Sequence, residues 1–184
     1  MAISLETVEY QRLGSPGDYA QLQDFSCGHG GYDLEVSLLV LQLYIGAGKT
    51  PGTDPFVVMR GGHRRMAGAP TVIVARTAKE VIGVSAYHLR PLYPIEGAGD
   101  EAYIWVIGIA AGHQGKGNGK RLLGRTMELI AEDWRHVPDI WALVSQGNAP
   151  SHALFRSCGF TLLPPEKEGD DYVRLRASAP LLSG

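Results

Sequence analysis

The chain has 184 residues, of which 45% are hydrophobic and 20% are charged. This length suits one well-packed core and is short for two domains, so we expect a single folded unit over residues 1–184. The composition excludes a disordered chain, and a formal net charge of −2 gives no general attraction to nucleic acid or to an anionic membrane. Cys27 and Cys158 are far apart and no secretory leader precedes them, so we predict free thiols and a cytoplasmic protein.

The first part of the chain predicts one strand, two helices and an irregular segment. Ile3–Arg12 alternates apolar and polar side chains and predicts a strand, whereas Asp18–Phe25 and Asp33–Ile45 predict helices. The apolar run in the second helix is interrupted by polar residues and is shorter than the roughly 20 residues that cross a bilayer. Gly and Pro are dense in residues 46–70, which we predict to be irregular and either mobile or substrate-facing, apart from a short strand at Phe56–Met59.

The rest of the chain alternates strands with helices. Strands are predicted at Thr71–Arg76 and Val81–Leu89, separated by four residues as in a hairpin, and at Glu101–Ala110. Apolar residues recur at helical spacing across Lys120–Trp134 and indicate an amphipathic helix packed on a sheet. A strand, a helix and two closing strands follow, at Ile140–Ser145, Ala149–Ser157, Phe160–Leu163 and Tyr172–Arg176. This order favours an α/β fold of the α+β kind, with a mixed sheet and helices on both faces.

A glycine-rich turn joins the strand that ends at Ala110 to the helix that begins near Lys120. Its sequence is Gln114-Gly115-Lys116-Gly117-Asn118-Gly119-Lys120. A strand, a glycine turn and a helix N-terminus in that order form an anion site, because backbone N–H groups converge where the helix dipole is positive and no Cβ blocks the approach. We therefore predict a phosphate or pyrophosphate site. It is not the dinucleotide fingerprint, since Lys120 stands where that pattern has its third glycine.

Two segments in the second half resemble the GNAT superfamily of N-acetyltransferases. One is Gln114-x-x-Gly117-x-Gly119 after a strand containing Ile107-Gly108-Ile109, and the other is Asn148 with Leu154–Phe160. The resemblance covers Tyr103–Phe160 and implies the GNAT-type acyl-CoA N-acyltransferase fold. In that fold a central, mostly antiparallel sheet is splayed at the cofactor site, here between the strand carrying Ile109 and the strand carrying Val144. Acetyl-CoA as co-substrate and the absence of a metal are also implied.

The resemblance also implies which residues contact acetyl-CoA. The backbone near Ile107 and Ile109 would pair with the pantetheine arm and help polarise the thioester carbonyl. Asn148 and Ser151 would lie beside the arm, and Phe155 would border it. The pyrophosphate would be held by Gln114, Gly115, Lys116, Gly117, Asn118, Gly119 and Lys120.

Phe155 departs from the family pattern, because many members have a Tyr there that could protonate the departing thiolate. Phenylalanine has no proton to give. Ser151, His152 or Cys158, on the same helix, could replace it, or the thiolate could leave unassisted because a thiol is already acidic.

Glu101 and His88 are the candidate general bases. Glu101 shares a face with Tyr103 and Trp105 by the period-2 rule unless a bulge intervenes, although a solvated carboxylate at a strand start is an equally good reading. His88 ends the preceding strand and has a side chain that titrates near neutral pH, although a single histidine there is more often structural or exposed.

Three other patterns carry weaker predictions. Gly46–Thr50 imitates the end of a P-loop but follows a predicted helix instead of a strand. Cys27 with scattered histidines does not have the paired spacing of a zinc site. The basic cluster within residues 60–65 is a solvated loop, or else it contacts adenosine phosphates, an acidic acceptor or RNA.

The leading interpretation is an acetyl-CoA-dependent N-acetyltransferase that moves an acetyl group to a primary amine of a small molecule or protein, by direct attack in a ternary complex. One alternative is toxin-like acetylation of aminoacyl-tRNA, suggested by Phe25-x-Cys27-Gly28 and the Gln114 turn but opposed by the net charge of −2. Another is a non-catalytic acyl-CoA-binding module, suggested by Phe155. We expect no membrane or nucleic-acid partner, and the closing strands could supply the edge of a homodimer.

Overall fold

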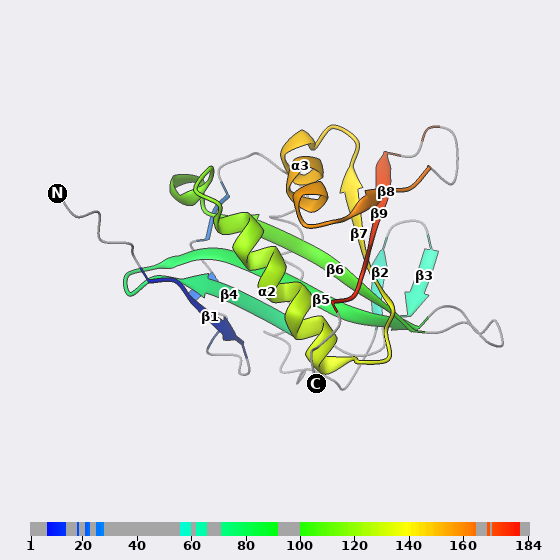
Figure 1. Cartoon of the computed structure of the whole chain (residues 1–184), viewed down its shortest axis with the longest axis horizontal. Coiled ribbons are helices and arrows are strands. Elements are labelled where there is room, and N and C mark those ends of the chain that lie inside the picture. Colours follow the sequence, from blue (N-terminus) through cyan, green and yellow to red (C-terminus); the bar gives the residue numbers. More distant parts are fainter. Residues whose placement is uncertain are drawn as a thin grey trace.

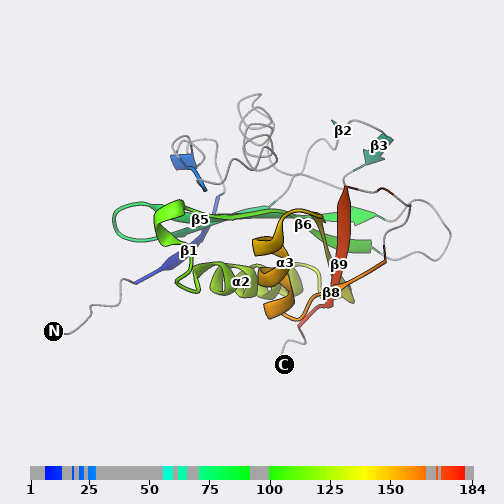
Figure 2. The ribbon, with the colours of Figure 1, turned by 90° about the horizontal axis from the view of Figure 1, so that it is seen from above.

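The computed structural model describes residues 7–13, 18, 21–22, 25–27, 56–59, 62–65, 71–91, 100–164, 169 and 171–180. The elements are β1 (Glu9–Arg12), β2 (Phe56–Met59), β3 (Gly62–Arg65), β4 (Thr71–Arg76), β5 (Val81–Pro91), β6 (Asp100–Ile109), η2 (Ala111–His113), α2 (Asn118–Asp133), β7 (Asp139–Ser145), α3 (Ala149–Ser157), β8 (Thr161–Leu162) and β9 (Tyr172–Ser178). Seven strands form one sheet in the order β1-β4-β5-β6-β7-β9-β8, and β2 pairs with β3 separately. In Figures 1 and 2, α2 and α3 lie on one face of the large sheet, and Figure 2 shows the β2–β3 hairpin on the other side.

From Thr71 onward the predicted elements match the observed ones to within two residues at each end. Two differences occur earlier in the chain. Residues Gly62–Arg65 form β3, although the sequence placed them in an irregular segment, and the first strand begins at Glu9, after residues 7 and 8, which are not in a strand. The helix predicted at Asp33–Ile45 lies outside the described residues, as do four of the eight residues of the helix predicted at Asp18–Phe25.

The sheet is antiparallel except where β6 runs parallel to β7. These two strands pair only through Ala102 with Ile140, Tyr103 with Trp141 and Ile104 with Ala142. Beyond that point β6 continues to Ile109 and β7 to Ser145 without pairing to each other. The predicted GNAT-type splay of a mixed, mostly antiparallel sheet is therefore confirmed.

A β-bulge at Trp105 decides which side chains of β6 face the helices. Along β5, Ala86 pairs with Val106 and Tyr87 pairs with Ile104, so Trp105 is the extra residue. Before the bulge, alternation places Glu101, Tyr103 and Trp105 on the face away from α2. After it, Ile107 and Ile109 belong to the core beneath α2 instead of following Tyr103 and Trp105.

Each face of the sheet has its own core. The larger core lies under α2 and α3 and includes Leu122, Leu123 and Ile130 from α2. The smaller core, on the opposite face, contains Leu13, Leu22, Val72, Val74, Val84, Ala86 and Val106. Among the described residues, no helix is both long enough and apolar enough to cross a lipid bilayer.

The C-terminal end of α2 is anchored to two strands. The hydroxyl of Tyr87 on β5 donates to one carboxylate oxygen of Asp133 at 2.7 Å, and Arg12 on β1 donates to the other at 2.8 Å. Trp134 packs edge-on against the Tyr87 ring, with centroids 5.5 Å apart. These contacts fix the C-terminal end of α2 against β1 and β5.

Candidate functional site

The glycine turn forms a cradle of backbone donors at the N-terminus of α2. Gly115 and Gly117 have φ angles of 71° and 77°, in the left-handed region that favours glycine. The first bond into the helix is donated by the Arg121 N–H to the Gly117 carbonyl at 3.1 Å. Within the described part of the chain, the N–H groups of residues 115–120 have no hydrogen-bond acceptor. These donors, at the positive end of the helix dipole, suit an anion with several oxygens.

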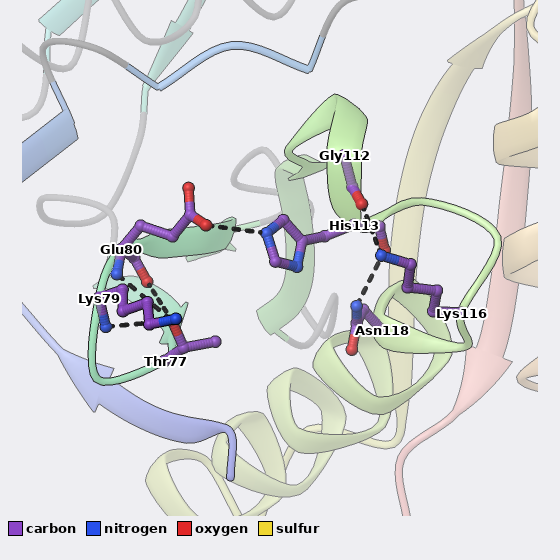
Figure 3. A network of polar contacts seen from close by, with 7 residues as sticks. All are labelled: Thr77, Lys79, Glu80, Gly112, His113, Lys116 and Asn118. Atoms are coloured by element: carbon purple, nitrogen blue, oxygen red, sulfur yellow. Dashed lines mark hydrogen bonds and ion pairs between the residues drawn. The ribbon is translucent and has the colours of Figure 1, made fainter. Parts of the chain in front are cut away.

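Two side chains of the cradle brace it from within. Lys116 donates from Nζ to the Gly112 carbonyl at 2.7 Å (Figure 3). Asn118, which is buried, donates to the His113 carbonyl at 2.8 Å and accepts from the Arg121 guanidinium at 2.6 Å. Because both side chains are engaged in the loop, their backbone N–H groups are what this geometry offers to a ligand.

The cradle is also tied to the turn between β4 and β5. The Nε2 atom of His113 lies 3.1 Å from a carboxylate oxygen of Glu80 (Figure 3). Glu80 is itself held in the turn, since its N–H and that of Lys79 both donate to the Thr77 hydroxyl. The hairpin therefore supports the loop from one side.

The side chain of Gln114 connects the cradle to the end of β6. Its amide nitrogen donates to the Ile109 carbonyl at 2.9 Å and to the Cys27 carbonyl at 2.7 Å. The sequence placed Gln114 among the pyrophosphate ligands, whereas the structure uses its amide to join two main-chain segments. The Cys27 contact was not foreseen, because nothing in the local pattern links residues so far apart.

The open edge of β6 presents further backbone groups. The Ala110 N–H donates to the Ile82 carbonyl of β5 at 2.9 Å. Because successive N–H groups of a strand point to opposite edges, those of Ile107 and Ile109 point toward the edge that β7 has left. An extended chain entering the splay could pair with them as a strand would.

The two segments singled out by sequence meet at this place. A Cβ built on Gly119 would lie 3.4 Å from the Leu154 side chain of α3, and Cys158 Sγ lies 3.9 Å from the Lys120 carbonyl oxygen. Asn148 caps α3 by accepting from the Ser151 N–H at 3.1 Å. The structure thus brings Asn148–Cys158 beside the cradle.

Phe155 and the candidate proton donors on and just after α3 differ in their surroundings. Phe155 is 3% exposed and packs edge-on against Phe160, at 4.9 Å between centroids. His152 is buried, and its Nε2 lies 3.0 Å from the Ser145 carbonyl at the end of β7. Ser151 and Cys158 are half-buried. A buried imidazole bonded to β7 therefore anchors α3 to the sheet, whatever else it does.

The two candidate bases lie away from the cradle. Both sit on the face opposite to α2 and α3, where His88 is buried and stacks on Tyr103 at 5.9 Å, and Glu101 is half-buried opposite Arg90 in the register. Glu101 precedes Ile109 by eight residues, about 27 Å along a strand. The structure does not bring Glu101 or His88 to the phosphate end of the site; His88 is the nearer to the splay.

Three residues near the splay were not singled out from the sequence. Trp141 of β7 lies beneath the guanidinium groups of Arg174 and Arg176 on β9, at 4.7 Å and 5.7 Å from the ring centroid. The sequence could have predicted that Arg174 and Arg176 share one face of a strand, because they alternate with the apolar Leu175, which is buried.

Comparisons with known proteins agree with this geometry. Residues 45–160 match the acetyltransferase (GNAT) family. Over 87 residues the chain is 37% identical to the L-2,4-diaminobutyric acid acetyltransferase of Shouchella clausii (strain KSM-K16). That alignment covers 47% of this chain and 44% of the relative, so the likeness spans less than half of either protein.

Solved structures share the fold over nearly the whole chain. A GNAT-family acetyltransferase from Desulfovibrio desulfuricans superposes with a TM-score of 0.64 at 17% identity, covering 95% of this chain and 100% of that one. A Tyr-to-Phe mutant of the toxin AtaT, bound to the C-terminus of the antitoxin AtaR and to acetyl-CoA, gives a TM-score of 0.63 at 16% identity, covering 94% and 93%.

Proposed function

This chain belongs to the GNAT family of acetyltransferases, and from that premise we propose that it transfers an acetyl group from acetyl-CoA to a primary amine within a ternary complex. The observation that carries the proposal is the coincidence of two features at one end of the sheet. The glycine cradle opens α2 immediately after β6, and β6 parts from β7 on the same stretch of chain. Binding of acetyl-CoA to a solved protein of this fold supports the choice of donor.

The glycine cradle and the open edge of β6 would bind different parts of acetyl-CoA. The N–H groups of residues 115–120 would receive the pyrophosphate, since they lack acceptors within the described residues and a side chain at Gly115 or Gly117 would be strained. The N–H groups of Ile107 and Ile109 would pair with the extended arm. Asn148, Ser151 and Phe155, at the start of α3 and along it, would border the arm on its other side.

The reaction needs an unprotonated amine and a place for negative charge. The amine nitrogen attacks the thioester carbonyl carbon, a C–N bond forms, and the carbonyl oxygen becomes an oxyanion that backbone N–H groups of the β6 edge would stabilise. The C–S bond then breaks, the thiolate leaves, and the nitrogen gives up a proton. We assign the proton acceptor to His88 or Glu101, directly or through water, and the proton for the thiolate to Ser151, His152 or Cys158, or to solvent.

A small-molecule amine is the acceptor class we favour over a protein amine. The relative from Shouchella clausii is named for a diamino acid, which supports this choice although the alignment covers less than half of that protein. Acetylation of aminoacyl-tRNA is the alternative, and it requires a strong, salt-dependent affinity for tRNA. We also propose a cytoplasmic location, because both cysteines are free thiols, and a homodimer through the edge strand β8.

The decisive experiment is calorimetric titration of the purified protein with acetyl-CoA, CoA and ATP. Gly117→Glu places a carboxylate in the cradle and should weaken acetyl-CoA binding at least tenfold, about 1.4 kcal/mol. Gly124→Glu is the matched control, because a Cβ at Gly124 on α2 meets nothing within 4 Å. Absence of acetyl-CoA binding, or equal losses in the two variants, would contradict the proposed site.

A further inference from the structure

A row of aromatic and basic side chains crosses the sheet where β6 and β7 are last paired. His88, Tyr103, Trp141 and Arg176 are successive partners across β5, β6, β7 and β9. Tyr103 stacks on His88 at 5.9 Å and on Trp141 at 6.4 Å. The row lies on the face away from α2 and α3, so it belongs to neither the cofactor cradle nor the main core.

The next rows extend the feature along the open side of the splay. Leu143 pairs with Arg174, and both lie one row beyond the last β6–β7 pairs. Leu143 is 43% exposed and Tyr172 is 45% exposed, and they are the exposed large hydrophobic residues of the described chain. We define the arginine–tryptophan patch as Trp141, Leu143, Tyr172, Arg174 and Arg176.

Two positive charges converge in this patch. The guanidinium carbons of Arg174 and Arg176 lie 4.7 Å and 5.7 Å from the centroid of the same indole. Nη1 of Arg176 lies 4.0 Å from a carboxylate oxygen of Asp139, the outer limit of an ion pair, and the Arg176 side chain is 49% exposed. Like charges held together at a partly exposed site favour an anion between them, and a guanidinium fork suits a carboxylate in particular.

The indole N–H of Trp141 is a second, independent indication that the patch binds a ligand with an acceptor oxygen. Trp141 is 8% exposed, and its Nε1 is buried with no hydrogen-bond partner among the described residues. Buried indole N–H groups usually find an acceptor, so an oxygen supplied at this point would complete the site. The adjacent Leu143 and Tyr172 offer apolar surface for a short carbon skeleton.

We propose that the arginine–tryptophan patch binds a carboxylate of the acceptor, so that the preferred acceptors are small amines that also carry a carboxylate group. This inference rests on the proposed acetyl transfer and specifies its substrate class. With its carboxylate on Arg174 and Arg176, such a molecule would lie along β7 with its amine free to enter the splay. Arg174 and Arg176 are then specificity-determining residues that act on acceptor binding.

The kinetic test compares acceptors that differ only in the carboxylate. L-2,4-diaminobutyrate and other α,ω-diamino acids are each paired with their primary amides, at saturating acetyl-CoA. The acids should be preferred at least tenfold in kcat/KM, mainly through KM, and Arg174→Gln with Arg176→Gln should abolish the preference while the Kd for acetyl-CoA stays unchanged. Arg125→Gln is the matched control, because Arg125 lies on α2 and pairs with Glu128 and Glu132. Equal use of acids and amides by the wild type, or a preference that survives in the double variant, would overturn the inference.

A binding readout separates this inference from the proposed function. In the ¹⁵N-labelled protein the indole signal of Trp141, assigned by its loss in Trp141→Phe, should shift on addition of the diamino acids and not of their amides, even if no acetyl-CoA is bound. If the protein does not bind acetyl-CoA but the indole signal still shifts with the diamino acids, the proposed acetyl transfer is contradicted and the carboxylate site is not. A signal that responds equally to acids and amides, or to tRNA and not to the acids, would overturn the carboxylate site.

Discussion

The amide nitrogen of Gln114 lies 2.9 Å from the carbonyl oxygen of Ile109, and it also donates to the Cys27 carbonyl at 2.7 Å. The first residue of the glycine turn is thereby hydrogen-bonded to the last residue of β6 and to Cys27, which lies 87 residues earlier in the chain. This arrangement fixes the angle at which the chain leaves the strand and enters the cradle. The Gln114 side chain thus helps to align the β6 edge with the N-terminus of α2, together with the Lys116, Asn118 and His113 contacts of the turn.

Gln114→Ala should therefore weaken both folding and cofactor binding. Loss of the amide leaves two partly buried carbonyls without their donor, and the free energy of unfolding should fall by about 1–3 kcal/mol. Gln114→Glu should be worse, because it keeps the shape and sets carboxylate oxygens against carbonyl oxygens. Urea unfolding and acetyl-CoA titration measure the two effects. If Gln114→Glu binds acetyl-CoA as tightly as the wild type, the two hydrogen bonds of the Gln114 amide do not determine the geometry of the cofactor site.

Gly117 and Gly119 should respond differently to the same substitution. Gly117 has φ 77°, so Gly117→Ala is strained by about 1–2 kcal/mol. At Gly119 a Cβ would meet Leu154 and Ile109 at 3.4–3.6 Å, an ordinary contact inside a helix. Gly119→Ala should therefore fold at least as stably as the wild type, whereas Gly117→Ala should lose stability and acetyl-CoA affinity together. Thermal unfolding with and without acetyl-CoA would show this, and equal behaviour of both variants would contradict a strained cradle.

Gly83 of β5 leaves no room for a side chain between the sheet and α2 beside the site. A Cβ there would lie 2.8 Å from Ile109 Cδ1 and 3.1 Å from Leu122. Gly83→Ala should push Ile109 aside and cost about 1–3 kcal/mol. Gly124→Ala, at an open position of α2, should instead stabilise by about 0.5–1 kcal/mol. Chemical denaturation compares the pair, and a stable Gly83→Ala protein with unchanged acetyl-CoA affinity would show that Ile109 can move freely.

The sequence was sufficient to predict the elements around the site, because their signals are local. The alternating run in β6, the helical spacing of α2 and the glycines at 115 and 117 each depend on neighbours within a few residues. The splay was anticipated only through the family resemblance. Local patterns say nothing about where two strands stop pairing.

The features that were missed depend on contacts between distant segments. The Trp105 bulge is a matter of register between β5 and β6, and the Gln114 bond to Cys27 joins segments that share no pattern. Gly62–Arg65 was placed in an irregular segment because Gly and Pro are dense in residues 46–70, yet pairing with Phe56–Met59 gives a strand. Tertiary pairing overrides local preference in each case.

Tyr87 should make the stability of the fold sensitive to alkaline pH. Burial, followed by its hydrogen bond to Asp133 and the charge of that carboxylate, raises the pKa of the Tyr87 hydroxyl well above its ordinary value. A raised pKa means that the folded state favours the protonated phenol. This contribution is fully present below about pH 10, where tyrosine titrates in an unfolded chain, and is lost as the pH rises toward the raised pKa.

Tyr87→Phe tests this directly. Near pH 8 the variant should be less stable by about 1 kcal/mol, because the hydrogen bond to Asp133 is lost while Arg12 still pairs with that carboxylate. Above pH 10 the wild type should lose up to about 1.4 kcal/mol per pH unit more than the variant, so the difference between them should shrink and then reverse. Tyr10→Phe, at a half-buried tyrosine on β1, controls for general alkaline effects. Parallel curves for wild type and Tyr87→Phe between pH 9 and 12 would show that the phenol of Tyr87 ionises as easily in the folded protein as in the unfolded chain.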